Sequence, residues 1–289
     1  MRESNIEQGH NQRLVGCGWL ADRLDDPGVR VIEVSSDPTG AAYQSGHIPG
    51  AAFWFWKDAL WHATDREFAT PGEMAGRLGA IGVTPDTIIV LYGDPVQYAT
   101  YAFWVLTMAG HRDVRLLDGS RKRWTAEGRP LTTVVPEYAP GEYSPGATDN
   151  SSRVGRDNVR ANLKNPDRVL LDVRSPEEFL GERVGPVSMG FDHGAERSGR
   201  IPGARHLFYQ DLLNDDDTFI DPDELREKFT AAGVEPDGNS EVVAYCRLSH
   251  RATLAWFAMT RLLERDRVKI YDGSWTEWGS IVGFPIEKE

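Results

Sequence analysis

Cysteine is scarce in this sequence: Cys17 and Cys246 are the only two among 289 residues. Two thiols so far apart do not make the disulfide framework of a small secreted protein, and they are too few for a zinc site. The seven histidines show no ligand spacing beside them. We therefore expect no metal and no other cofactor.

Long apolar runs and an excess of positive charge are missing as well. No stretch of about 18 apolar residues occurs, and residues 1–13 are polar without a signal-peptide core. The 44 Asp and Glu outnumber the 32 Lys and Arg, which gives a net charge of −12. An acidic protein repels nucleic acid and anionic membranes. We expect a cytoplasmic protein whose partners are small molecules, with a monomer favoured and the oligomeric state left open.

What the sequence does contain is an internal repeat. Gly46–Ala51 (GHIPGA) returns 153 residues later as Gly199–Ala204 (GRIPGA), and Ile89–Tyr92 returns at the same offset as Val242–Tyr245. Constant offsets over such a span indicate two copies of one domain. A chain of this length has room for two domains with a full core in each.

Each copy alternates short β-rich runs with helical patterns. Several runs, such as Thr87–Tyr92 and Glu241–Tyr245, are almost wholly apolar, as expected for parallel strands covered by helices on both faces. We predict an α/β fold with two tandem domains, 1–135 and 153–289, each with a central parallel sheet flanked by helices. Residues 136–152 contain three prolines and two glycines and no apolar period, which indicates a linker.

Cys246 stands where one of these strands ends and a helical stretch, residues 252–263, begins. Ligands bind beyond the carboxyl ends of strands in such sheets, and a short loop before a helix collects several backbone N–H groups. Arg247 and Arg251 add positive charge beside the sulfur. We therefore predict that Cys246 is a nucleophilic thiolate. Cys17, between two glycines and away from any motif, is interpreted as a packing thiol.

The two copies differ at this loop and in length. The first copy places Gly93–Tyr98 opposite Cys246–Arg251 and has no thiol there, so we predict that it is catalytically inactive. The second copy carries an insertion over residues 181–197, which contains Arg183 and Arg197. Two interpretations stay open for it: a functional segment near the site, or a tolerated surface loop.

Further motifs occur in a fixed order along the chain. They are DVRSPEEF at Asp172–Phe179, the GHIPGA turn with its variant GRIPGA, and YDGSWTEW at Tyr271–Trp278. Together with a single cysteine in the second copy, this set resembles the tandem-domain sulfurtransferases of the rhodanese family. The resemblance extends over nearly the whole chain.

The resemblance implies a reaction as well as a fold. The Cys246 thiolate would take the outer sulfur of thiosulfate as a persulfide and pass it to cyanide or a thiol; 3-mercaptopyruvate is the alternative donor. A persulfide anion needs convergent N–H donors, and an arginine fork suits an oxyanion. The residues predicted to bind the substrate are Arg247, Leu248, Ser249, His250, Arg251, Arg183 and Trp275.

Several positions depart from the family's pattern. Ser249 stands where glycine is usual, and we expect its side chain to cap the following helix. Leu248 replaces a basic residue, and Glu178 falls where a substrate-binding arginine is common. Arg251 either binds the donor anion or braces the loop through backbone carbonyls. Asp172 and Arg174 are interpreted as structural, pinning the strand end.

Two other functions are compatible with a cysteine–arginine loop. A phosphatase on the same scaffold would place five residues between cysteine and arginine, whereas only four separate Cys246 from Arg251. The shorter loop suits a single sulfur atom better than a phosphoryl group. The second alternative is a non-catalytic sulfur carrier or regulatory module.

Overall fold

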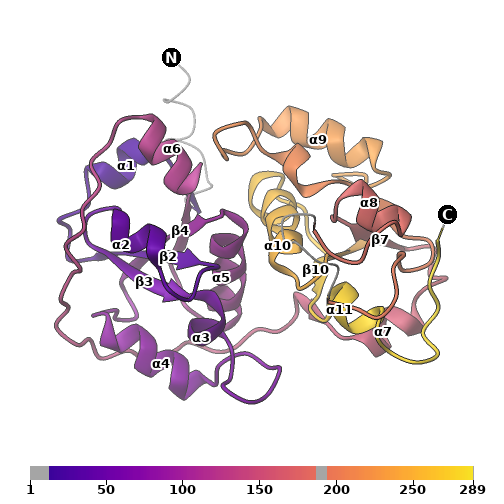
Figure 1. The fold of residues 1–289 in the computed structure, drawn as a ribbon, viewed down its shortest axis with the longest axis horizontal. Coiled ribbons are helices and arrows are strands. Elements are labelled where there is room, and N and C mark those ends of the chain that lie inside the picture. The colour runs from indigo at the N-terminus through magenta and orange to yellow at the C-terminus, as the bar shows by residue number, and fades with distance from the viewer. Residues whose placement is uncertain (1–12, 187–193, 289) are drawn as a thin grey trace. The chain divides into compact units, whose positions relative to one another are not determined.

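The computed structural model describes residues 13–186 and 194–288, and the chain divides into two compact units (Figure 1). The boundary lies between Asp149 and Asn150, inside the predicted linker, and Asp215–Thr218 is grouped with the first unit. Both units have the α/β architecture expected from the sequence.

The first unit is built on a parallel sheet with the strand order β1-β5-β4-β2-β3. Figure 1 shows helices on both sides of it. In chain order the elements are β1 (Leu14–Val15), α1 (Cys17–Ala21), β2 (Val29–Ser35), α2 (Ala41–Ser45), β3 (Ala51–Phe55), α3 (Trp56–Leu60), α4 (Pro71–Ala80), β4 (Ile88–Asp94), α5 (Gln97–Met108), β5 (Val114–Leu117) and α6 (Ser120–Ala126).

The second unit repeats this plan with the strand order β6-β10-β9-β7-β8, again all parallel. Its elements are β6 (Arg153–Val154), α7 (Arg156–Ala161), β7 (Arg168–Asp172), α8 (Pro176–Leu180), β8 (Arg205–His206), the 3-10 helix η2 (Tyr209–Leu212), α9 (Pro222–Ala231), β9 (Glu241–Tyr245), α10 (His250–Phe257), the π-helix η3 (Ala258–Leu262), β10 (Val268–Tyr271) and α11 (Ser274–Trp278). The identical strand order confirms the two copies predicted from the repeat.

The cores repeat as well. Trp124 and Trp278 are both fully buried, each in the last labelled helix of its unit. Their indole N–H groups donate to the carbonyls of Pro130 (2.9 Å) and Pro285 (2.7 Å). A buried tryptophan removes a large apolar area from water and needs an acceptor for its N–H, and each unit meets both requirements in the same way.

In the second unit a buried ion pair pins the end of β7. The Arg174 side chain is fully buried and donates to Asp172 through Nε (2.9 Å) and Nη2 (2.6 Å), and Nη2 also donates to the Gly199 carbonyl (2.7 Å). The Tyr245 hydroxyl accepts from Ile201 N at 3.1 Å. Asp172 and Arg174 thus hold the GRIPGA turn, which confirms their structural role.

In the first unit the corresponding GHIPGA turn is held by an arginine from a different element. Tyr92 and Arg121 both donate to the buried carboxylate of Glu33, and Arg121 also donates to the Gly46 carbonyl. The Tyr92 hydroxyl in turn accepts from Ile48 N. Arg121 comes from α6, whereas Arg174 lies two residues after the end of β7. The turn is therefore tied down in both copies by a tyrosine, an acid and an arginine.

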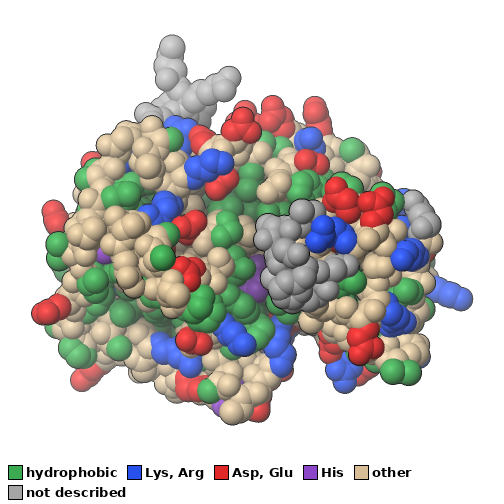
Figure 2. Space-filling view, in the orientation of Figure 1, with side chains coloured by type: hydrophobic (Ala, Val, Ile, Leu, Met, Phe, Trp, Pro, Cys, Tyr) green, Lys and Arg blue, Asp and Glu red, His purple; other side chains and the backbone are tan. Residues whose placement is uncertain are grey.

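Acidic and basic side chains are interspersed over the face drawn in Figure 2. Among the described residues, no helix combines the length and apolar character needed to cross a membrane. The same part of the chain contains no cluster of histidine, cysteine and carboxylate side chains that could bind a metal ion.

Candidate active site

Cys246 follows β9, the central strand of the second sheet, at its carboxyl end. The residue is 1 % exposed. Its backbone N–H donates to Ser274 Oγ at 3.2 Å, and this hydroxyl donates to the carbonyl of Tyr271 at 2.9 Å. The start of the loop is therefore fixed by the turn that follows the neighbouring strand β10.

The carbonyls of the loop are held by the same turn. Trp275 N donates to the Cys246 carbonyl at 2.9 Å, and Thr276 N donates to the Arg247 carbonyl at 3.1 Å. Two carbonyls of the loop are therefore bonded to backbone N–H groups of α11. These hydrogen bonds satisfy loop carbonyls that would otherwise be buried without partners.

Ser249 is in the left-handed conformation, with φ 73° and ψ −23°. Its hydroxyl lies 2.5 Å from the Asp272 carbonyl and 3.0 Å from Asp272 Oδ1, and it makes no capping hydrogen bond to α10. The prediction that Ser249 caps the helix is wrong. A capping serine needs an extended backbone, whereas the left-handed one directs this side chain toward Asp272. Serine thus adopts the backbone that usually requires glycine.

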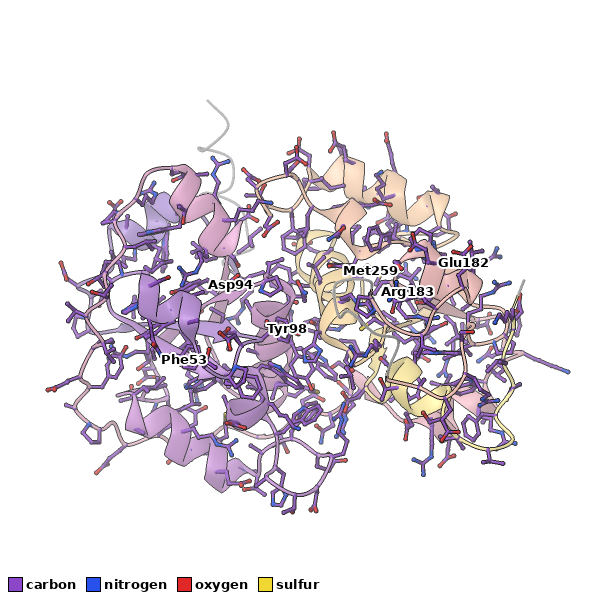
Figure 3. The ribbon with its side chains drawn as sticks, in the orientation of Figure 1. Phe53, Asp94, Tyr98, Glu182, Arg183 and Met259 are labelled. Carbon is purple, nitrogen blue, oxygen red and sulfur yellow. The ribbon has the colours of Figure 1, made fainter. Side chains whose placement is uncertain are left out.

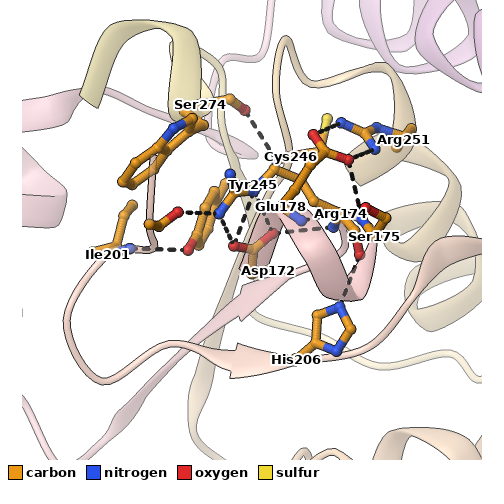
Figure 4. A network of polar contacts seen from close by, with 12 residues as sticks. Asp172, Arg174, Ser175, Glu178, Ile201, His206, Tyr245, Cys246, Arg251 and Ser274 are labelled. Atoms are coloured by element: carbon orange, nitrogen blue, oxygen red, sulfur yellow. Dashed lines mark hydrogen bonds and ion pairs between the residues drawn. The ribbon is translucent and has the colours of Figure 1, made fainter. Parts of the chain in front are cut away.

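Arg251 lies on α10 and forms a buried ion pair with Glu178 of α8 (Figure 4). Nη1 donates to Oε2 at 2.6 Å and Nη2 donates to Oε1 at 2.9 Å. Arg251 thus makes a carboxylate contact that neither sequence interpretation included. Burial works to raise the pKa of Glu178, but the hydrogen bonds and charge of Arg251 hold that pKa below its usual value.

Tyr209, at the start of η2, was not singled out from the sequence. The Arg251 guanidinium carbon lies 5.8 Å from the centre of its ring. The pKa of the Tyr209 hydroxyl is raised, first by burial and to a smaller extent by the negative charge of Cys246. Tyr209 therefore lies close to the Arg251 side chain and within electrostatic range of Cys246. No motif or period in the sequence distinguishes it from the chain's other tyrosines.

The C-terminal end of the predicted insertion, residues 194–197, lies beside Arg247 and α11, while residues 187–193 lie outside the described residues. Gly194 packs against Arg247: a Cβ atom at Gly194 would lie 2.6 Å from Arg247 Nε. Arg183, labelled in Figure 3, donates from Nε to the carbonyl of the nearby Gly185. Arg197 donates to four carbonyls around the end of α11, those of Trp278, Gly279, Ile281 and Phe284.

The other predicted substrate-binding residues occupy different environments. Leu248 is partly exposed on the loop, and His250, the first residue of α10, is 7 % exposed. Trp275 is fully buried in the core. Its indole N–H donates to the Arg197 carbonyl at 3.0 Å, and the Arg174 guanidinium lies 4.6 Å from its ring centre. Trp275 thus supports the loop from the core side.

The first unit keeps the framework of this site without its chemistry. Gly93 N donates to Ser120 Oγ at 3.1 Å, which repeats the bond from Cys246 to Ser274. A Cβ atom at Gly93 would lie 2.6 Å from the Pro95 carbonyl oxygen. The first site therefore lacks both the thiol and the space for one, and the inactivity of the first unit stays a prediction.

Cys17 lies in α1 and is 3 % exposed. Burial, with a smaller contribution from the charge of Glu127, raises the pKa of its thiol to about 12. A thiol with that pKa carries almost no thiolate near neutral pH. This confirms Cys17 as a packing residue and leaves Cys246 as the candidate nucleophile.

Comparison with known proteins identifies the family. Residues 17–127 and 156–281 each match the model of the rhodanese-like domain. The chain belongs to the rhodanese family. The two rhodanese domains coincide with the two units described above, and Cys246 lies in the second.

Relatives that match nearly full length carry names related to sulfur transfer. The chain is 42 % identical over 283 residues to the sulfur carrier protein TtuD of Thermus thermophilus, covering 96 % of this chain and 98 % of that protein. It is 38 % identical over 281 residues to a protein of Haloferax volcanii named "Putative thiosulfate sulfurtransferase", covering 95 % and 96 %.

Solved structures superpose on the chain as well. The anaerobic ergothioneine biosynthesis enzyme of Chlorobium limicola, solved with trimethyl histidine, matches with a TM-score of 0.83 and 26 % identity, over 97 % of this chain and 72 % of that one. An EanB variant with a cysteine persulfide and ergothioneine matches with a TM-score of 0.84 and 26 % identity, over 96 % and 70 %.

The left-handed backbone of Ser249 predicts different effects for two substitutions. Ser249→Ala loses the hydroxyl contact with Asp272 and keeps the strain, so we expect a loss of about 1–3 kcal/mol in the free energy of unfolding. Ser249→Gly loses the same contact but relieves roughly 1 kcal/mol of strain. Urea unfolding should therefore find the glycine variant more stable than the alanine variant. The reverse order would contradict the assigned conformation.

Because the loop at Gly93 is closed, we predict that a cysteine introduced at this position does not support sulfur transfer. In the double variant Gly93→Cys/Cys246→Ser, we expect no sulfur transfer, because the new Cβ collides with the Pro95 carbonyl. The measurement is thiocyanate release from thiosulfate and cyanide, with Cys246→Ser as the control. Recovery of activity by the double variant would show that the first site is intact apart from its thiol.

Proposed function

We propose that this protein is a sulfurtransferase that carries the sulfane sulfur of thiosulfate on Cys246 and passes it to a thiophilic acceptor, cyanide or a thiol. The observation that carries the proposal is the position of Cys246 at the end of the central strand, in a loop closed by Arg251. Family membership supports the reaction class, and the names of the full-length relatives point the same way.

The reaction balances without any added oxidant or reductant. The Cys246 thiolate attacks the outer sulfur of thiosulfate, a new S–S bond forms to Sγ, and the old S–S bond breaks. Its electron pair leaves with sulfite. The persulfide then gives its terminal sulfur to cyanide, which forms thiocyanate and restores the thiolate. The protein supplies position and positive charge, since a thiolate needs no general base.

The geometry of the loop supports a small transferred atom. Cys246 and Arg251 are separated by four residues, and the left-handed Ser249 lets the loop turn as glycine would. The departure from glycine at this position therefore does not argue against activity. We propose Arg247 as a donor-binding residue because it follows Cys246 directly and is partly exposed. The alternative donor, 3-mercaptopyruvate, would use the same thiolate.

A sulfur carrier is the second candidate, and the Thermus relative is the observation that favours it. A carrier shares the first half of the reaction but delivers its sulfur to a protein thiol instead of turning over with cyanide. The two candidates therefore differ in the acceptor and agree on the Cys246 persulfide.

The persulfide is the direct test. After incubation with thiosulfate, we expect mass spectrometry to find one added sulfur atom on Cys246, removed again by cyanide as thiocyanate. Cys17→Ala is the matched control and should show the same gain, whereas Cys246→Ser should show none. Loading without turnover would favour the carrier. No loading by thiosulfate or 3-mercaptopyruvate, with Cys246 still open to alkylation, would refute the proposal.

Arg247 provides a test of donor binding. Replacing it by methionine removes charge-assisted hydrogen bonds to the donor, so we expect the KM for thiosulfate to rise about 10- to 100-fold. Arg247→Lys should lose less because it keeps the charge. Arg226→Met, at an exposed ion pair with Asp237, is the control and should leave steady-state kinetics unchanged. An unchanged KM in Arg247→Met would remove Arg247 from the donor site.

A further inference from the structure

We propose that Glu178 is a charge filter for the sulfur-donor site: by pairing with Arg251, it penalises doubly charged donors such as thiosulfate more than singly charged ones. This inference rests on the function proposed above. Glu178 acts through Arg251 and does not itself touch the donor, so it is a specificity-determining and positioning residue rather than a catalytic one.

The first step is the rigidity of the carboxylate. Glu178 is the third residue of α8, and its Oε2 accepts from Ser175 N at 3.2 Å in a reciprocal capping box (Figure 4). Both oxygens also accept from Arg251. A carboxylate fixed by its own helix and by a two-pronged arginine contact has little freedom to turn away.

The second step is burial. The Glu178 side chain is fully buried and that of Arg251 is 11 % exposed. Salt screens charges in water but acts weakly on buried ones, so the charge of Glu178 reaches the nearby sulfur with little attenuation. Surface carboxylates, in contrast, contribute little to the potential at the site.

The third step connects the pair to Cys246. Figure 4 shows the Cys246 side chain beside the Arg251–Glu178 pair. Burial works to lower the pKa of Arg251, but its hydrogen bonds to Glu178 and the negative charge of Cys246 together raise it. Arg251 is thus shared between a thiolate and a carboxylate. The three groups carry one net negative charge, whereas the thiolate and Arg251 alone would be neutral. An incoming anion therefore meets repulsion that grows with its own charge.

Two matched donors separate this effect from a general change in reactivity. Thiosulfate carries two negative charges, and methanethiosulfonate has a methyl group in place of one charged oxygen while keeping the same sulfane sulfur. In Glu178→Gln, which preserves the size and the capping contact, we expect persulfide formation to speed up on the order of 30-fold with thiosulfate and about 5-fold with methanethiosulfonate. The measurement is kcat/KM for each donor.

Glu177→Gln is the matched control, because it removes an exposed carboxylate from the same helical turn and should leave the ratio of the two donors unchanged. Equal effects of Glu178→Gln on both donors would overturn the inference. If neither donor loads Cys246 in the native protein, it is instead the proposed sulfurtransferase function that fails.

A double variant keeps the test decisive if Glu178→Gln does not fold. Glu178→Met/Arg251→Met removes both charges together, and apolar replacement of a whole buried ion pair is often tolerated. The net charge beside Cys246 is then the same as in the native protein, so the donor ratio should stay within about twofold of the native value. A shift of the ratio beyond about fivefold would overturn the inference.

Discussion

The segment Asp272–Thr276 determines the shape of the Cys246 loop. It accepts the Cys246 N–H and the Ser249 hydroxyl, and it donates to the carbonyls of Cys246 and Arg247. This segment follows β10, and β10 pairs in parallel with β9. Parallel neighbours bring their carboxyl ends to the same edge of a sheet, so the strand register itself places the two loops together. Cys246, the proposed nucleophile, is therefore held in place by the protein's own hydrogen bonds.

The first unit shows which parts of this arrangement are structural. Gly93 keeps the backbone contact with a serine that Cys246 makes, although it has no thiol to position. The buried tyrosine, acid and arginine are also kept, with Arg121 in the place of Arg174. A buried carboxylate without a counter-ion is strongly destabilising. The requirement for a counter-ion therefore holds in the unit without the thiol too, where an arginine from a helix meets it.

Much of the fold and the position of the candidate site could be predicted from the sequence alone. Constant repeat offsets gave the two domains, apolar runs gave the central strands, and the strand–cysteine–helix junction gave Cys246. The expected helix cap at Ser249 was wrong because a cap assumes an extended backbone, and the local sequence does not reveal a left-handed one. Tyr209 was missed because its relation to Cys246 arises between segments far apart in the chain.

The sequence by itself determined the fold class and the duplication, and it singled out Cys246 as the proposed nucleophile, because these depend on local periods and on direct repetition. Only the tertiary structure decided how the charged side chains are arranged around Cys246. Arg251 looks like a free anion binder in a six-residue loop, yet it forms an ion pair with Glu178, which lies 73 residues earlier. The parallel pairing of β7 with β9 brings helix α8 and the Cys246 loop together, and their contact makes the loop arginine part of a neutralised pair.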